Sequence, residues 1–302
     1  MTNVQAPVFS RPAGGGPASV SRNFLAAITT ASSNLPSRVI LHGNEGVGKT
    51  SFAAHAPGVV FLQSRGETGL DTLIGSGRLP ETAHWPETAN TWEEALGMIA
   101  SLRGEHEYKT LAIDTLNGLE KLCAEYTRKN FFGDDHEAYM SFGKGDGVAA
   151  NQWRELIALL DEIRAAKRMS IICLAHTKIR TFANPEGTDY DRYEVDMKKE
   201  SWALTLRWAD MCLFANYFTT TAKESKTDNK VIGKGGRERV LYTERAAAFD
   251  AKNRHGLPPM IQMGSSGADA WRNFAAAIKA AKPQPAAKPA AAVEPATTDA
   301  TT

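Results

Sequence analysis

The sequence predicts an α/β fold, in which a mostly parallel sheet has helices on both faces and an antiparallel extension near the C-terminus. Apolar runs that are typical of buried strands occur at residues 38–42, 58–63, 109–114 and 169–176. Helical stretches separate these runs at residues 91–103, 115–130 and 148–167. Strands that are apolar at nearly every position are typical of parallel sheets covered on both faces. The last runs, 210–218 and 239–245, lie close together and are polar at alternate positions, which predicts the antiparallel extension.

The composition predicts one domain, residues 22–280, between two tails. Residues 1–21 are rich in Gly, Pro and Ser, and residues 281–302 are low-complexity Ala, Pro and Thr, so we expect both tails to be disordered. The 302 residues are 42% hydrophobic and 23% charged, which is enough to build a buried core. The net charge is only +1, so a binding site for a polyanion has to be a local patch.

The cysteines and the hydropathy indicate where the protein works. Cys123, Cys173 and Cys212 are widely spaced and odd in number, which argues against a disulfide framework or a zinc site and favours a reducing cytoplasm. No apolar run approaches the roughly 18 residues of a membrane-spanning helix. We therefore expect a cytoplasmic protein without a membrane partner.

The strand-like run 38–42 leads into a glycine-rich loop with the pattern GxxxxGK[ST], the Walker A motif, which a helix follows. The glycines let the backbone wrap closely, so that N–H groups and the helix N-terminus face a phosphate. Lys49 is placed to reach the β- and γ-phosphates, and the Thr50 hydroxyl to bind Mg²⁺. No base-reading motif separates ATP from GTP, and we expect ATP. The expected nucleotide-binding residues are Gly43, Asn44, Glu45, Gly46, Val47, Gly48, Lys49, Thr50 and Ser51.

Asp114 ends the apolar run 109–114, 65 residues after Lys49, which predicts a Walker B carboxylate that holds Mg²⁺ through water. An Asp that caps the following helix would give the same pattern. Hydrolysis also needs a group that orients or deprotonates the attacking water. Many ATPases place a Glu directly after the Walker B Asp, but here that residue is Thr115. Either the carboxylate comes from elsewhere in the chain or hydrolysis is slow.

The order of these motifs resembles the RecA/DnaB-type ATPase core. More narrowly, it resembles the core-only RecA-like ATPases of bacteriophages, the Sak-type single-strand annealing and recombination proteins. The resemblance spans about residues 38–260 and rests on HGNEGVGKTSFA, YKTLAIDTLN, ICLAHTK, RWADMCLFANY and DAKNRHGLP. It implies a RecA-like P-loop fold and Mg²⁺-dependent ATP hydrolysis by a homo-oligomer. It also implies action on single-stranded DNA in recombination, annealing or replication, in the cytoplasm of a bacterial host.

The resemblance also implies roles for four further residues. Glu67, just past the strand after the P-loop helix, would be the catalytic carboxylate. His176, at the end of run 169–176, would sense the γ-phosphate. Lys252 and Arg254 match a K-x-R pattern whose cations reach the γ-phosphate bound by a neighbouring subunit. Residues two apart on an extended segment point the same way, so we expect both cations to be aimed at one target.

Three segments are candidate contacts for single-stranded DNA. By resemblance, residues 131–151 and 177–200 would be the DNA-binding loops. The second loop carries aromatic residues among its cations, which suits single strands, but its five basic and six acidic residues give it a net charge of −1. The better basic patch is 223–239, with a net charge of +3.

Other functions stay open at this point. One is a replication-type hexameric helicase or its loader. Another is a nucleotide-gated scaffold that hydrolyses slowly, which Thr115 and the acidic second loop favour. The Ala/Pro-rich tail is a candidate site for recruiting a single-strand DNA-binding protein.

Overall fold

The structure, a computed structural model, describes residues 25, 28–29, 35–223 and 231–281. The chain divides into Met1–Asn34 and Leu35–Thr302, and all helices and strands given below belong to the second unit. Residues 1–21 and residues 282–302 of the two tails expected to be disordered lie outside the described residues, whereas residue 281 is the last residue of helix α8. The domain limits of 22 and 280 stay a prediction.

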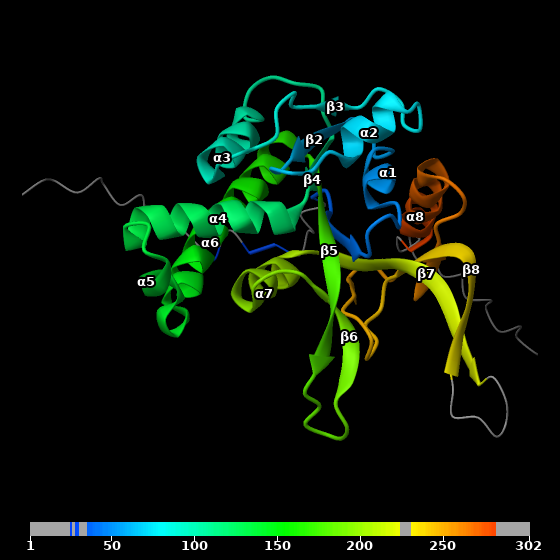
Figure 1. Ribbon diagram of the computed structural model, residues 1–302. Helices are drawn as coiled ribbons and strands as arrows, with labels where there is room; N and C mark the ends of the chain where they lie inside the picture. The colour runs from blue at the N-terminus through cyan, green and yellow to red at the C-terminus, as the bar shows by residue number, and fades with distance from the viewer. Residues whose placement is uncertain (1–24, 26–27, 30–34, 224–230, 282–302) are drawn as a thin grey trace, which may run out of the picture. The chain divides into compact units, whose positions relative to one another are not determined.

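A single ten-stranded sheet forms the centre of the fold (Figure 1). Its order is β10-β8-β7-β1-β5-β4-β2-β3, with β6 paired to β5 and β9 to β7. The strands from β3 to β7 in this order are parallel, whereas β8, β10, β6 and β9 pair antiparallel. The strands are β1 Arg38–Gly43, β2 Val59–Gln63, β3 Ala83–His84, β4 Thr110–Asp114, β5 Ser170–Phe182, β6 Tyr190–Val195, β7 Met211–Lys223, β8 Val231–Tyr242, β9 Lys252–Asn253 and β10 Met260–Gln262. The predicted α/β fold, with a mostly parallel sheet and antiparallel strands toward the C-terminus, is confirmed.

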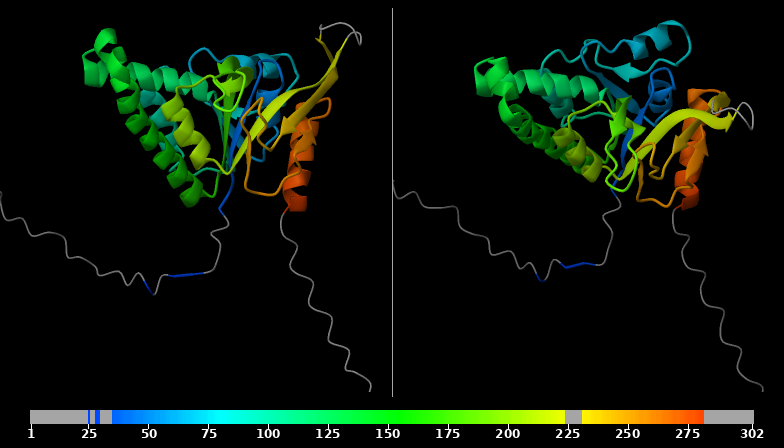
Figure 2. Two further views of the ribbon diagram at one scale, coloured as in Figure 1. Left: turned by 90° about the horizontal axis from the view of Figure 1, so that it is seen from below. Right: turned by 60° about the horizontal axis from the view of Figure 1, so that its bottom comes forward.

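Helices cover both faces of this sheet, as the apolar strands predict. One core contains Ile40 of β1 together with residues of α3, α4, α6 and α7, and the other contains Val39 and Leu41 with residues of α1, α2 and α8. The long helices α4 and α6 thus lie on one side of the sheet and α8 on the other (Figure 2). The helices are α1 Lys49–Ala53, α2 Gly69–Gly75, α3 Trp92–Ser101, α4 Leu116–Phe132, α5 His136–Met140, α6 Lys144–Lys167, α7 Lys199–Trp208 and α8 Gly267–Ala281, with a short 3₁₀ helix, η1, at Ser141–Gly143.

Two strands run past the carboxyl edge of the sheet and form two projecting arms. Gly43, the last residue of β1, pairs with His176 of β5 and with Ala215 of β7. Beyond these pairs, β5 continues with β6 and β7 continues with β8 as antiparallel hairpins (Figure 1). We call them the β5–β6 arm and the β7–β8 arm. Both arms therefore begin beside the P-loop.

The prediction that residues 131–151 form a loop is wrong, because most of this segment is helical. The Asp135 side chain accepts the N–H of Ala138 at 3.0 Å and starts α5. Of its glycines, Gly133 caps the C-terminus of α4, Gly143 is the N-cap of α6, and Gly145 and Gly147 lie within α6. Gly145 allows close packing, since a Cβ there would lie 2.5 Å from Tyr139.

The second predicted loop, 177–200, is also wrong, because it contains the end of β5, all of β6 and the start of α7. Alternation of charged and apolar residues along 177–182 fits a solvent-exposed strand, which pairs only with β6 here.

Among the described residues, no helix has the length and apolar character that a membrane crossing requires.

Candidate active site

The Walker A loop connects β1 to α1 at the carboxyl edge of the sheet. Gly48 caps α1 with a left-handed backbone (φ 101°), a conformation that glycine adopts without strain. Gly43 permits a close approach to β7, because a Cβ there would lie 2.2 Å from the Ala215 carbonyl oxygen. Lys49 is buried and its Nζ donates to the carbonyl oxygens of Gly43 and Asn44, both at 2.9 Å. The loop is therefore wrapped around its own lysine.

A cavity of about 420 Å³ lies against this loop. Its wall contains Gly46, Gly48, Lys49, Thr50 and Ser51 of the loop. Asp114, Glu67 and His176 complete the polar side, and Thr72, Leu73 and Arg78 extend the cavity along α2. A site of this size is in the range that holds a small organic ligand. The sequence-predicted residues from four separate segments thus meet around one cavity.

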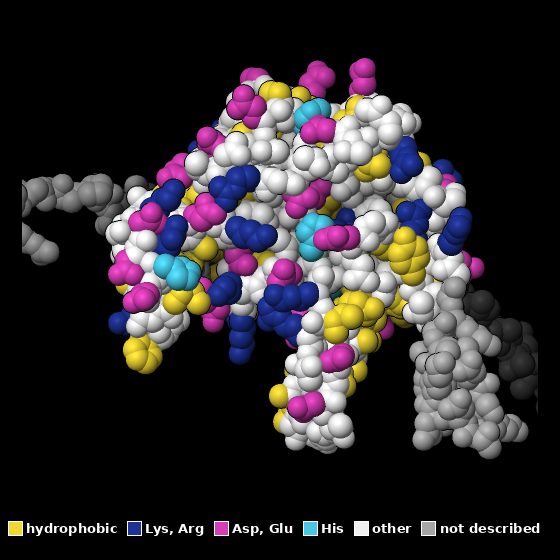
Figure 3. All heavy atoms as spheres, in the orientation of Figure 1, with side chains coloured by type: hydrophobic (Ala, Val, Ile, Leu, Met, Phe, Trp, Pro, Cys, Tyr) yellow, Lys and Arg dark blue, Asp and Glu magenta, His cyan; other side chains and the backbone are white. Residues whose placement is uncertain are grey.

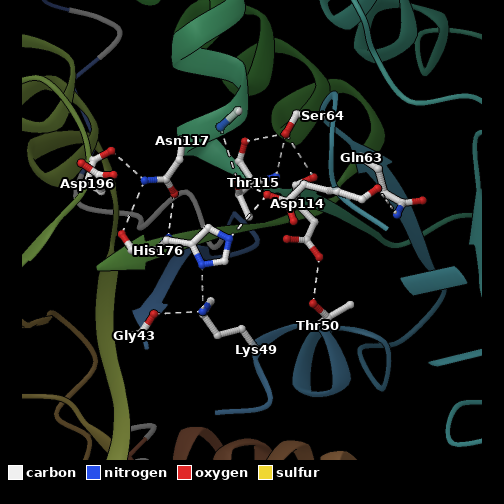
Figure 4. A network of polar contacts seen from close by, with 12 residues as sticks. Gly43, Lys49, Thr50, Gln63, Ser64, Asp114, Thr115, Asn117, His176 and Asp196 are labelled. Atoms are coloured by element: carbon white, nitrogen blue, oxygen red, sulfur yellow. Dashed lines mark hydrogen bonds and ion pairs between the residues drawn. The ribbon is translucent and has the colours of Figure 1, made fainter. Parts of the chain in front are cut away.

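Two oxygen-bearing side chains that could hold a divalent cation, Thr50 and Asp114, face each other in the cavity. The Thr50 hydroxyl donates to Asp114 Oδ2 at 2.8 Å (Figure 4). Asp114 ends β4 and is buried, and burial raises the pKa of its carboxyl group to about 6. Hydroxyl and carboxylate oxygens are the donors that Mg²⁺ prefers. The pair fits the Mg²⁺ that the sequence predicts, and a cation there would favour the ionised form of Asp114.

Glu67 lies beside His176 and Thr115 at the same edge. Its Oε1 is 3.4 Å from His176 Nε2 and accepts a hydrogen bond from the Thr115 hydroxyl at 3.0 Å. The contact with His176, more than that with Thr115, holds the pKa of Glu67 below its usual value. His176 Nδ1 is 3.5 Å from Lys49 Nζ. The lysine, the histidine and the glutamate therefore form one continuous chain of contacts.

Three polar residues, to which the sequence motifs assign no such role, hold this chain in place. Asn117 Oδ1 accepts the backbone N–H of His176 at 2.7 Å, and its Nδ2 donates to the Asp196 carbonyl oxygen at 2.8 Å (Figure 4). Ser64 Oγ accepts the Thr115 N–H at 3.1 Å. Thr115 was noticed only as the residue that replaces a Glu. All three follow closely on the ends of β2 or β4, so the rule that functional residues follow parallel strands would have found them.

The Walker A loop also contacts the base of both arms. Asn44 Oδ1 accepts from the Thr177 hydroxyl at 3.2 Å, and Asn44 Nδ2 lies 3.4 Å from Asn216 Oδ1. Thr177 begins the β5–β6 arm and Asn216 the β7–β8 arm. Arg239 of β8 donates to the Val47 carbonyl oxygen at 3.4 Å. A change in the loop on nucleotide binding would therefore reach both arms directly.

Lys252 and Arg254 lie away from the P-loop of their own chain. β9 pairs with Met211 and Cys212 at the start of β7, so both cations are at the amino edge of the sheet. Lys252 Nζ donates to the carbonyl oxygens of Leu206, Arg207 and Ala209 at 2.7, 3.0 and 2.6 Å, at the C-terminal end of α7. Arg254 is 53% exposed and makes a 3.7 Å contact with Asp210.

Lys252 and Arg254 have different surroundings, which indicate different roles for the two side chains. An ammonium group has three donors, and Lys252 uses all three to satisfy carbonyl groups that a helix end leaves free. The Arg254 guanidinium group, with five donors, is 53% exposed and contacts Asp210 at 3.7 Å. Of the K-x-R pair, Arg254 is the cation that a neighbouring subunit could use.

A family model described as "AAA domain" matches residues 35–255 of the chain. Among curated proteins, no sequence matches this chain. Among solved structures, the flagellar accessory protein FlaH from Methanocaldococcus jannaschii is similar to the chain with 13% sequence identity and a TM-score of 0.40. That match covers 80% of this chain and 91% of the FlaH chain.

Proposed function

The chain belongs to the AAA domain family, and from this we propose that it binds ATP with Mg²⁺ and hydrolyses the γ-phosphate at the cavity beside Lys49. One observation carries the proposal. The Walker A lysine, the Thr50–Asp114 oxygen pair and a separate carboxylate, Glu67, line the same cavity. Binding, charge neutralisation and water activation are the three tasks of phosphoryl transfer to water, and this wall has a group for each.

Lys49 and the loop amides would bind the β- and γ-phosphates. The lysine is buried and burial lowers its pKa, which an approaching phosphate would offset by favouring the charged form. Thr50 and Asp114 would hold Mg²⁺, which neutralises charge on the phosphate oxygens. His176 contacts both Lys49 and Glu67, so it is placed to respond to the γ-phosphate.

Glu67 would accept a proton from the attacking water. A base must be ionised at the working pH, and the contacts from His176 and Thr115 keep the pKa of Glu67 low. Its position at the end of the strand beside β4 puts the carboxylate next to the Mg²⁺ ligand Asp114 without requiring a Glu at position 115. In this proposal Glu67 replaces the Glu that many ATPases have directly after the Walker B Asp, so Thr115 can occupy that position.

Glu67→Gln should therefore bind ATP normally and hydrolyse it slowly. We expect kcat to fall by about 10²–10⁴-fold, the usual contribution of a general base, because the amide cannot take the proton. Steady-state phosphate release measures turnover, and calorimetry with a non-hydrolysable ATP analogue measures binding. Glu107→Gln, an exposed residue outside the cavity, is the matched control. Full turnover in Glu67→Gln would show that the base is another group.

Single-stranded DNA is the proposed effector, and the β7–β8 arm is its proposed binding surface. β8 of this arm carries Arg237, which is exposed, and Arg239, and Tyr217 and Phe218 on β7 are 37% and 36% exposed. Both arginines belong to the segment 223–239, whose sequence has a net charge of +3. Cations bind phosphates and exposed aromatic rings stack on bases. This fits a phage-encoded protein that acts in recombination or annealing, as the Sak-type resemblance implies.

The β5–β6 arm is the weaker candidate for DNA. Lys178 pairs with Asp196, Arg180 lies 3.9 Å from Glu194, and Arg192 lies 2.6 Å from Asp250. Acidic and apolar side chains are visible along this arm in Figure 3. Cations that already have acidic partners have less to gain from a phosphate. The arm suits a protein partner better, which is the observation that favours a nucleotide-gated scaffold as the second function.

Reversing one charge on each arm tests this assignment. Arg237→Glu should weaken binding of a fluorescent single-stranded oligonucleotide and lower its dependence on salt, because one phosphate contact is lost. Arg180→Glu should leave binding close to that of the unmodified protein. Fluorescence anisotropy at two salt concentrations measures both. Loss of binding in Arg180→Glu but not in Arg237→Glu would move the DNA to the β5–β6 arm, and no binding by any form would favour the scaffold.

A further inference from the structure

The hydroxyl group of Thr115 makes two hydrogen bonds of opposite kind. It accepts the backbone N–H of Gly118 at 3.3 Å, which caps α4, and it lies 3.0 Å from Glu67 Oε1. A hydroxyl has one proton to donate, and a backbone N–H can only donate. The proton of Thr115 is therefore free to be given to Glu67, and the ionised carboxylate is an acceptor only. The α4 cap and the carboxylate contact are compatible and use different parts of one group.

Hydrogen bonds fix the backbone of Thr115, so its hydroxyl group has a defined position beside Glu67. Ser64 Oγ accepts the Thr115 N–H at 3.1 Å, and the Ser64 N–H donates to the Asp114 carbonyl oxygen at 2.8 Å (Figure 4). Ser64 and Thr115 are both fully buried. Gly118 leaves room for this contact, since a Cβ there would lie 1.9 Å from Ser64 Oγ. The strand end of β2 and the N-terminus of α4 are thus tied together beneath Glu67.

We propose that Thr115 is the positioning residue of Glu67, fixing one carboxylate oxygen so that the other faces the attacking water. This inference rests on the proposed function, in which Glu67 is the base. Thr115 and His176 approach the same oxygen, Oε1, at 3.0 and 3.4 Å. Both contacts thus hold one oxygen of the carboxylate and leave Oε2 for the water in this proposal. In this proposal the carboxylate that activates water is Glu67, which follows the neighbouring strand β2. Thr115, the residue after Asp114, holds it.

Thr115→Val removes the hydroxyl and keeps the size of the side chain. We expect kcat to fall by about 10–100-fold, because a displacement near 1 Å of a catalytic group has an effect of this size. The affinity for the ATP analogue and KM should change little, since the residues that line the cavity do not include Thr115. Thr115→Ser keeps both hydrogen bonds and should restore turnover. Retained turnover in Thr115→Val, or no rescue by Thr115→Ser, would overturn the proposal.

Loss of the α4 cap is a separate effect, and Thr91→Val controls for it. Thr91 caps α3 by accepting the Glu94 N–H at 3.1 Å and lies in a different part of the fold. Thr91→Val should lower the melting temperature, as Thr115→Val does, but leave kcat unchanged. A matching loss of kcat in Thr91→Val would assign the Thr115 effect to stability and overturn the proposal.

A double-mutant cycle links Thr115 to Glu67 itself. Thr115→Val combined with Glu67→Gln should be no slower than Glu67→Gln alone, because there is no carboxylate left to position. A further loss by the full Thr115→Val factor would mean that Thr115 acts elsewhere and would overturn the proposal. Normal turnover in Glu67→Gln would instead overturn the proposed function, so the two failures are distinguishable.

Discussion

Lys49→Ala is expected to abolish ATP hydrolysis and to weaken ATP binding strongly. The lysine is the one buried cation at the cavity wall, and it contacts both the Walker A carbonyl groups and His176. Removing a single preorganised donor from a developing oxyanion reduces rates by about 10²–10³-fold, and Lys49 also supplies a full charge. We therefore expect a loss of at least about 10³-fold in kcat/KM.

Phosphate release and calorimetry with the ATP analogue measure the two effects of Lys49→Ala. Lys279→Ala changes a lysine in the last turn of α8, away from the cavity, and should leave both unchanged. Circular dichroism confirms that each variant is folded. Normal binding and hydrolysis in Lys49→Ala would mean that the nucleotide does not bind at the Walker A loop.

Arg254→Ala should reduce turnover by about 10³-fold or more if its guanidinium completes the site of a neighbouring subunit, as arginine fingers do. The residue is 53% exposed and its contact with Asp210 is 3.7 Å long. Asp210 keeps a stronger partner in Arg38, at 2.7 Å, so the change should leave the fold intact. The prediction requires an oligomer, which we propose from the exposed position of Arg254 at the edge opposite its own P-loop.

Mixing two inactive variants tests the finger in trans. Lys49→Ala keeps Arg254, and Arg254→Ala keeps Lys49, so a mixed oligomer contains some interfaces with both residues. Part of the activity should return on mixing. Arg272→Ala, another exposed arginine paired with an acid, is the matched control. Normal hydrolysis by Arg254→Ala at high protein concentration, or a mixture that stays inactive, would contradict the assignment.

Lys252→Ala should behave differently from its neighbour in the K-x-R pattern. It removes three hydrogen bonds to the C-terminal carbonyl groups of α7, so we expect the free energy of unfolding to fall by about 1–3 kcal/mol. Turnover per folded molecule should remain. Chemical denaturation measures the stability, and a selective loss of kcat without loss of stability would return Lys252 to the active site.

The nucleotide site could be predicted because its parts follow one geometric rule. The carboxyl ends of parallel strands meet at one edge of a sheet, so Gly43, Asp114 and His176 come together when the strands are identified correctly. Glu67 joins them because β2 lies beside β4. Each of these residues lies at or just after the end of a strand, so the order of the strands in the sheet is enough to predict where it lies.

The arms and the K-x-R segment could not be predicted in the same way. The outer half of β5 pairs only with β6 and is largely exposed, so it lacks the continuous apolar run that predicts a buried strand. β9 is two residues long and Arg254 lies beyond it, so the rule for alternate residues of a strand does not extend to the pair. The role of Lys252 depends on the end of α7, more than forty residues earlier in the chain. Contacts of this kind follow from the tertiary fold and have no local signature.

The rate of ATP hydrolysis by the purified protein, measured with Mg²⁺ across protein concentration and with and without single-stranded DNA, is the most direct test of the proposed ATPase. We expect Mg²⁺-dependent hydrolysis that disappears in Glu67→Gln, rises more than linearly with protein and increases with DNA. A rate that does not exceed that of Lys49→Ala under any of these conditions would contradict hydrolysis at this site.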